Sequence, residues 1–64
     1  MKMDEEKLRE YLKPEICYDF RKVRGAVLLH TWHLFETERI PFREAIKRAW
    51  AKVKEICREK GAYI

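Results

Sequence analysis

The sequence predicts a small all-α protein, either a helical hairpin or a three-helix bundle, with a flexible N-terminal part. Apolar residues recur at alternating spacings of three and four along most of the chain, which is the periodicity of helices buried on one side. The chain has two prolines, and they divide this pattern into three segments. Its 64 residues suffice for one domain, and a domain of this size buries only about 60% of the surface of its unfolded chain.

The first segment, residues 1–14, is predicted to be a short N-terminal helix followed by a proline break. Asp4 is placed to cap the helix, and Pro14 ends it because the residue before a proline avoids the helical region. We expect residues 15–64 to form the hairpin domain proper. The apolar stripe of the first helix consists of Leu8, Tyr11 and Leu12.

The second segment, from about Glu15 to Glu36, carries two apolar stripes. Gly25 lies inside it and weakens a helix by about 1 kcal/mol relative to Ala, so we expect the helix to bend or begin anew there. A hairpin core cannot cover both stripes, so the second must meet the first helix, a second copy or another protein. The first stripe consists of Ile16, Phe20, Val23, Val27, His30 and Leu34, and the second of Leu28, Trp32 and Phe35.

The third segment, from about Pro41 to Lys60, has the clearest helical pattern. Pro41 suits a first helical turn, and Gly61 suits the residue after the last turn. We expect Trp32 and Trp50 to be the largest side chains of the core. The apolar side consists of Phe42, Ile46, Ala49, Trp50, Val53, Ile56 and Cys57.

The composition is typical of a heat-adapted intracellular protein. Charged residues make up 41% of the chain, and it contains no Asn, Gln or Ser. It has neither a membrane-spanning apolar run nor a signal-peptide core, so we expect a cytoplasmic protein. Cys17 and Cys57 are then expected to be reduced thiols, although hyperthermophile cytosols also contain disulfides.

Metal binding and catalysis are weakly supported. Zinc prefers ligands of the types found at Cys17, His30, His33 and Cys57, but the usual Cys-x-x-Cys spacing is absent. The alternative is two buried thiols and two histidines at the edge of the core. A bundle this small has no room for a substrate pocket. We therefore predict no metal, no cofactor, no small-molecule substrate and no enzymatic activity.

Nucleic-acid binding is the second choice. The formal net charge is +4, which favours anionic partners. The alternative is a solvated helix face, and Glu44, Glu55 and Glu59 on the same helix weaken the cationic character. A possible phosphate-contact face consists of Arg43, Lys47, Lys54 and Arg58.

Protein recognition is the preferred interpretation, and it centres on "KPEICYDF", residues 13–20. Short peptides bind grooves by inserting a few aliphatic and aromatic side chains from one helical turn. Ile16 and Phe20 lie on one side of such a turn, with Tyr18 nearby. The alternative is that Ile16 and Phe20 simply pack on the third helix.

This segment resembles the motif by which proteins bind the DNA sliding clamp PCNA, Gln-x-x-aliphatic-x-x-aromatic-aromatic. Ile16 takes the aliphatic place and Phe20 the second aromatic place, while Lys13 stands for the Gln and Asp19 for the first aromatic residue. Tyr18 lies one place early. In length, charge and composition the chain is similar to the Thermococcales inhibitors of PCNA. The resemblance implies an archaeal protein that binds the clamp, disturbs the ring and blocks PCNA-dependent DNA replication.

The partner-binding residues that this resemblance implies are Lys13, Ile16, Tyr18 and Phe20. A second resemblance competes with it. "PFREAIKRAWAKVK" resembles the tails of short phage and plasmid proteins, which read aromatic-x-x-Ala-aliphatic-Lys-x-Ala-Trp. It implies a small DNA-binding or host-takeover regulator from a mobile element.

Overall fold

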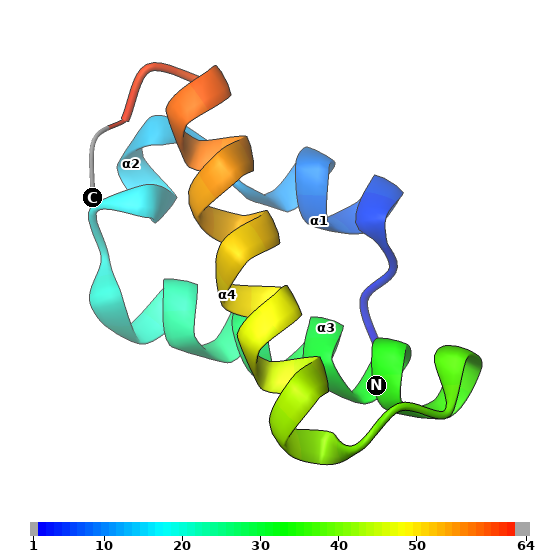
Figure 1. The fold of residues 1–64 in the computed structure, drawn as a ribbon. Helices are drawn as coiled ribbons and strands as arrows, with labels where there is room; N and C mark the ends of the chain where they lie inside the picture. Colours follow the sequence, from blue (N-terminus) through cyan, green and yellow to red (C-terminus); the bar gives the residue numbers. More distant parts are fainter. Residues whose placement is uncertain (1, 63–64) are drawn as a thin grey trace.

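The computed structural model describes residues 2–62 and shows an all-α fold (Figure 1). The fold class predicted from the sequence is therefore confirmed. Residues 1, 63 and 64, at the outer ends of the two predicted domains, lie outside the described residues. The described chain forms four helices, in the order α1 (Glu5–Tyr11), α2 (Pro14–Cys17), α3 (Phe20–Glu38) and α4 (Phe42–Glu59).

The two long helices, α3 and α4, make the principal helix pair of the fold. Figure 1 shows α1 and α2 following one another in a row above α3, with α4 crossing both rows. The two short helices also contact α3, so they belong to the same packed unit. No helix within residues 2–62 is long and apolar enough to cross a membrane.

The start of the chain folds as its cap and proline predict. The side chain of Asp4 accepts a hydrogen bond from the backbone N–H of Lys7 at 2.9 Å, which caps α1. Lys13 is extended, as a residue before proline prefers, and Pro14 opens α2. The apolar side of α1 is committed to the core, because Leu8 and the following Leu12 are fully buried.

The predicted helical segment from Glu15 to Glu36 is interrupted, but at Tyr18 and Asp19 and not at Gly25 as expected. The chain leaves the helical path after Cys17, and Asp19 caps the new helix α3. One carboxylate oxygen of Asp19 lies 3.1 Å and 3.3 Å from the backbone nitrogens of Arg21 and Lys22. The helix does not begin anew at Gly25, since α3 runs through this residue. An Asp side chain can satisfy exposed backbone N–H groups and start a helix, whereas a glycine only weakens one.

The third predicted helix is confirmed to within one residue at each end. The carbonyl of Pro41 accepts the first hydrogen bond of α4, from Ala45 at 3.0 Å. Gly61 has φ of 88°, the left-handed conformation that glycine adopts without strain. The N–H of Ala62 then donates to the carbonyl of Cys57 at 2.9 Å, which closes the helix end.

The core is built from small and medium side chains, and the prediction that two tryptophans dominate it is wrong. Trp32 is 45% exposed, and Trp50 is only partly buried at the edge of the core. Alanines at buried positions of α3 and α4 leave no room for an indole between the helices. The buried hydrophobic residues are Leu8, Leu12, Cys17, Val23, Ala26, Val27, Ala45, Ala49, Val53, Ile56, Cys57 and Ala62.

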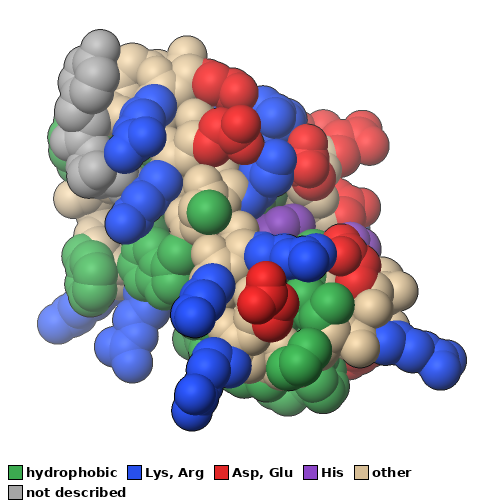
Figure 2. Space-filling model, in the orientation of Figure 1, with side chains coloured by type: hydrophobic (Ala, Val, Ile, Leu, Met, Phe, Trp, Pro, Cys, Tyr) green, Lys and Arg blue, Asp and Glu red, His purple; other side chains and the backbone are tan. Residues whose placement is uncertain are grey.

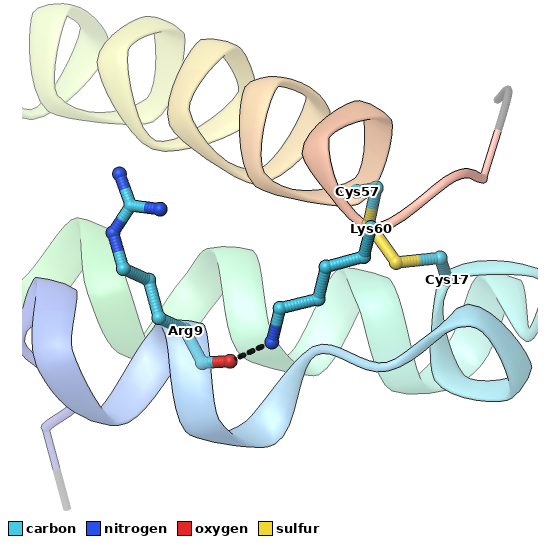
Figure 3. Close-up of a disulfide and its surroundings, with 4 residues drawn as sticks. All are labelled: Arg9, Cys17, Cys57 and Lys60. Carbon is cyan, nitrogen blue, oxygen red and sulfur yellow. Dashed lines mark hydrogen bonds between the residues drawn. A yellow bond between two sulfur atoms is a disulfide. The ribbon is translucent and has the colours of Figure 1, made fainter.

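A disulfide joins Cys17 of α2 to Cys57 of α4 (Figure 3), so the expectation of two reduced thiols is wrong. Both α2 and α4 pack on α3, and the Cα atoms of the two cysteines lie 5.9 Å apart, a separation that a disulfide spans. Near it, the ammonium of Lys60 donates to the backbone carbonyl of Arg9. The end of α4 is thereby connected both to α2 and to the end of α1.

The double variant Cys17→Ala, Cys57→Ala is expected to unfold with a free energy about 4 kcal/mol lower than that of the oxidised protein. The disulfide closes a loop between residues separated by 40 positions, and such a closure restricts the unfolded chain. Guanidinium denaturation measures the difference. A reductant should lower the stability of the wild type and leave the double variant unchanged. Equal denaturation midpoints for the oxidised protein and the variant would contradict the prediction.

Candidate partner-binding surface

A groove opens at the corner between α2 and α3, and we call it the corner groove. Its volume is about 610 Å³. Two aromatic side chains beside it are largely in solvent, since Tyr18 is 63% and Phe20 is 67% exposed. The groove is lined by Cys17, Tyr18, Phe20, Val23, Trp50 and Lys54.

The break between α2 and α3 creates this corner. Asp19 caps α3, so the helix restarts at Phe20 and places this side chain on its first turn. Trp50 of α4 forms the opposite side of the groove and packs on the edge of the core. The disulfide at Cys17 holds α2 against α4 beside the groove, so this side is fixed covalently. The groove therefore exists without a partner.

The groove combines apolar walls with one cationic group. The rings of Tyr18, Phe20 and Trp50 supply large apolar surfaces, and aromatic side chains are the usual anchors of protein interfaces. Lys54 is exposed on the same groove and carries a positive charge. The arrangement suits an apolar segment of another protein that also carries an acidic side chain.

The structure separates the four predicted partner-binding residues into two groups. Tyr18 and Phe20 line the groove together. Ile16 is partly buried and packs against the core, and Lys13 is exposed in the extended chain before α2. Since the helix breaks after Cys17, the isoleucine and the phenylalanine do not share one helical turn.

Sequence reasoning missed three further lining residues, Val23, Trp50 and Lys54. Val23 and Trp50 were assigned to the core, and Lys54 to the phosphate-contact face. Nothing in the local sequence marks them as neighbours of Tyr18, because α4 reaches the α2–α3 corner only through tertiary packing.

A basic stripe runs along the outer side of α4, and it consists of the predicted phosphate-contact residues. At about 100° per residue, these four positions fall within an arc of roughly 60°. All four are exposed, and no ion pair forms at any of them within residues 2–62. Lys54 also lines the corner groove, so the two surfaces are continuous. The stripe is formed by Arg43, Lys47, Lys54 and Arg58.

The carboxylates of α4 do not oppose this stripe, because each pairs with another cation. Figure 2 shows the Lys and Arg side chains in a row beside hydrophobic ones, with most acidic side chains gathered toward the right. The pairs are Glu44 with Arg48 at 3.3 Å, Glu55 with Lys52 at 2.9 Å, and Glu59 with Arg9 at 2.6 Å.

The four residues weighed as zinc ligands are engaged in other interactions. Cys17 and Cys57 are bonded to each other, so neither offers a thiolate. The Nδ1–H of the buried His30 donates to the backbone carbonyl of Met3 at 2.9 Å. His33 stacks on His30 with 5.9 Å between ring centroids. His30 therefore helps to attach the start of the chain to α3.

Two ion pairs, one between α1 and α4 and one within α4, shift the pKa values of their members. The hydrogen bond to Glu59 raises the pKa of Arg9, with a smaller contribution from Glu5. The hydrogen bond between Lys52 and Glu55 raises the pKa of Lys52 and lowers the pKa of Glu55. These groups are exposed, so each pair contributes little to stability and is screened by salt.

Comparisons of the chain with protein-family models, with curated proteins and with solved structures gave no match. The corner groove and the basic stripe are therefore the features from which a function is inferred. Both belong to the face of α4 that α1 leaves uncovered, since the pairs to Arg9 and Glu5 lie on the other flank of that helix.

The variant Lys52→Met is expected to raise the pKa of Glu55 toward its ordinary value, because the hydrogen bond from Lys52 is the largest cause of the lowered pKa. The lowered pKa contributes stability above the pKa of the unfolded chain, and this contribution disappears as the pH falls through the folded-state pKa. Carboxyl chemical shifts followed by NMR during a pH titration measure the change. Lys54→Met is the control, and an unchanged Glu55 titration in Lys52→Met would refute the assignment.

Proposed function

We propose that this protein is a non-catalytic inhibitor that binds the DNA sliding clamp PCNA through the corner groove and blocks PCNA-dependent replication. The observation that carries the proposal is the exposure of Tyr18 and Phe20 beside an apolar groove. The partner is taken from the resemblance of residues 13–20 to the clamp-binding motif.

Exposed aromatic side chains support a protein partner. A small domain gains stability by burying large rings, and Phe20 has Val23 only one turn away in the core. Here the ring of Phe20 instead projects beside a groove that Trp50 completes. Aromatic anchors next to a hollow form the central, energetically dominant part of many interfaces. The corner groove supplies this combination.

The disulfide also supports binding rather than catalysis. A free thiol at Cys17 could act as a nucleophile, but its sulfur is bonded to Cys57. The same bond fixes one side of the groove before any partner arrives. A preorganised surface loses less conformational entropy on binding, which raises affinity without new contacts. The bond therefore has a role in a binding surface.

We propose different roles for the four predicted partner-binding residues. Phe20 and Tyr18 insert into the hydrophobic pocket of the clamp, with Phe20 on the first turn of α3 as the main anchor. Ile16 supports the corner from the core side, because it is already partly buried. Lys13 stands in the extended chain before α2 and approaches the polar edge of the same site.

The variant Phe20→Ala is expected to weaken binding to the clamp at least about tenfold, because truncation of a buried aromatic anchor typically costs about 2 kcal/mol. Isothermal calorimetry with purified clamp measures the affinity. Circular dichroism should show the same helix content as in the wild type, since Phe20 is largely exposed.

The matched control is Leu28→Ala, which truncates another exposed apolar side chain of α3 outside the groove. Its affinity for the clamp should equal that of the wild type. If Phe20→Ala bound the clamp as tightly as the wild type, the corner groove would not be the binding surface. If the wild type did not bind the clamp, the clamp would not be the partner.

A second candidate function, DNA binding by a small regulator, is favoured by the basic stripe. Its four cations stand on one side of α4, while the carboxylates of that helix pair with Arg9, Arg48 and Lys52. Unpaired cations in a row are placed to neutralise successive phosphates. Basic and acidic residues alternate along the sequence of α4, but the fold places them on different sides of the helix.

If DNA is the partner, the double variant Arg43→Ala, Lys47→Ala should reduce the dependence of log K on log salt by about two, one unit for each phosphate that is no longer neutralised. Fluorescence anisotropy with a DNA duplex at several salt concentrations measures this slope. Neither residue lines the corner groove, so clamp binding should be unchanged. The control Lys7→Ala removes one charge from α1 and should leave the salt dependence unchanged. The same slope in the wild type and in both variants would exclude the basic stripe as a DNA-binding surface.

A further inference from the structure

A second exposed apolar surface follows α3, and neither proposed function uses it. We call it the α3 seam, and it consists of Gly25, Leu28, Trp32 and Phe35. The three large side chains are 44%, 45% and 37% exposed. Trp32 and Phe35 also contact Phe42 of α4, with ring centroids 5.1 Å and 5.7 Å apart. This is the second stripe of the sequence, and α1 does not cover it.

The glycine of the seam has no explanation within the molecule. A Cβ atom added to Gly25 would meet nothing within 4 Å, and the residue lies in regular helix. Glycine there costs about 1 kcal/mol relative to Ala. Its effect on the outside is to leave a notch in the helix surface next to Leu28. A notch of this kind admits a large side chain of a partner.

We propose that the α3 seam pairs with the same seam of a second copy of this chain, in antiparallel orientation about a two-fold axis. The residues are spaced by three, four and three positions, which is the spacing of residues facing a partner helix. In the antiparallel pair, Gly25 lies opposite Phe35 and Leu28 lies opposite Trp32. The notch at Gly25 then receives the ring of Phe35, and each contact occurs twice, as two-fold symmetry requires.

Charge selects this orientation. α3 begins with the exposed cations Arg21, Lys22 and Arg24 and ends with Glu36 and Glu38. An antiparallel partner places Lys22 and Arg24 near these carboxylates and brings Arg21 level with Arg39, whereas a parallel partner would place like charges together along the whole helix.

The two carboxylates of α3 already hold one internal cation each and remain accessible. Glu36 pairs with Lys2, and Glu38 pairs with Arg48 at 2.7 Å. Their side chains are still 43% and 46% exposed, so each can accept a second, intermolecular partner. Arg39 follows Glu38 at the margin of the seam, where solvent screens its charge.

Dimerisation through this seam leaves the corner groove available. The two-fold axis passes between Leu28 and Trp32, about ten residues and therefore about 15 Å along α3 from Phe20. Phe20 also points roughly a quarter turn away from the seam at about 100° per residue. The dimer thus carries two grooves, and it does not depend on the clamp-binding proposal.

Analytical ultracentrifugation of the full chain over about a hundredfold range of concentration tests the proposal. The wild type should pass from monomer to dimer. Leu28→Glu places a charge against Trp32 of the partner, and it should weaken dimerisation at least about tenfold. The control Ala51→Glu adds the same charge on the exposed side of α4 and should leave the dimer unchanged.

The variant Gly25→Ala distinguishes an effect on the dimer interface from an effect on the stability of the folded chain. Alanine fits the space around Gly25, so the melting temperature should rise when it is measured at a concentration where the wild type is monomeric. The same methyl group fills the notch that admits Phe35 of the partner, so dimerisation should weaken. A variant that is simply misfolded could not show both effects.

The orientation is tested by charge reversal. Lys22→Glu and Glu36→Lys should each weaken the dimer, and the two changes together should restore it if the helices are antiparallel. A wild type that stays monomeric at every concentration, or a dimer indifferent to Leu28→Glu and Gly25→Ala, would overturn the proposal. Clamp binding by Leu28→Glu is measured in parallel, so failure of the dimer and failure of the clamp proposal are distinguished.

Discussion

The bond between Cys17 and Cys57 is the constraint on which the rest of the structure depends. It ties α2, a helix of four residues, to α4. A helix this short is not stable by itself in water, because the conformational entropy lost in forming its first turn exceeds the free energy gained from its few hydrogen bonds. The bond holds α2 in place beside the start of α3, which Asp19 sets by capping that helix. The corner groove, with Phe20 beside it, is the direct result.

Charge and apolar surface are divided between the two flanks of α4. On one flank the carboxylates pair with cations of α1 and of α4 itself, and the N-terminal helix is held against the core. On the other flank the basic stripe runs beside the groove. A partner of mixed character, apolar with acidic groups, matches this second flank, whether the partner is a protein or the phosphates of DNA.

The helix α3 is apolar on more than one side, which explains both the core and the surplus surface. Val23, Ala26 and Val27 face the interior, while Leu28 and Trp32 remain half in solvent. A chain of 64 residues cannot enclose such a helix completely. Surface of this kind is a common origin of self-association. The notch at Gly25 then gives the exposed side a shape that fits its own copy.

The sequence by itself determined the all-α class, the caps at Asp4 and Gly61 and the extent of α4, because these depend on periodicity and on local backbone chemistry. It also pointed to Ile16 and Phe20 as anchors with Tyr18 nearby, but the structure leaves only Tyr18 and Phe20 exposed and packs Ile16 against the core. Only the tertiary structure decided that Cys17 meets Cys57, that Trp50 completes the groove, and where the carboxylates of α4 are engaged. Each of these joins residues far apart in the chain, and the packing of α1, α2 and α4 on α3 sets them.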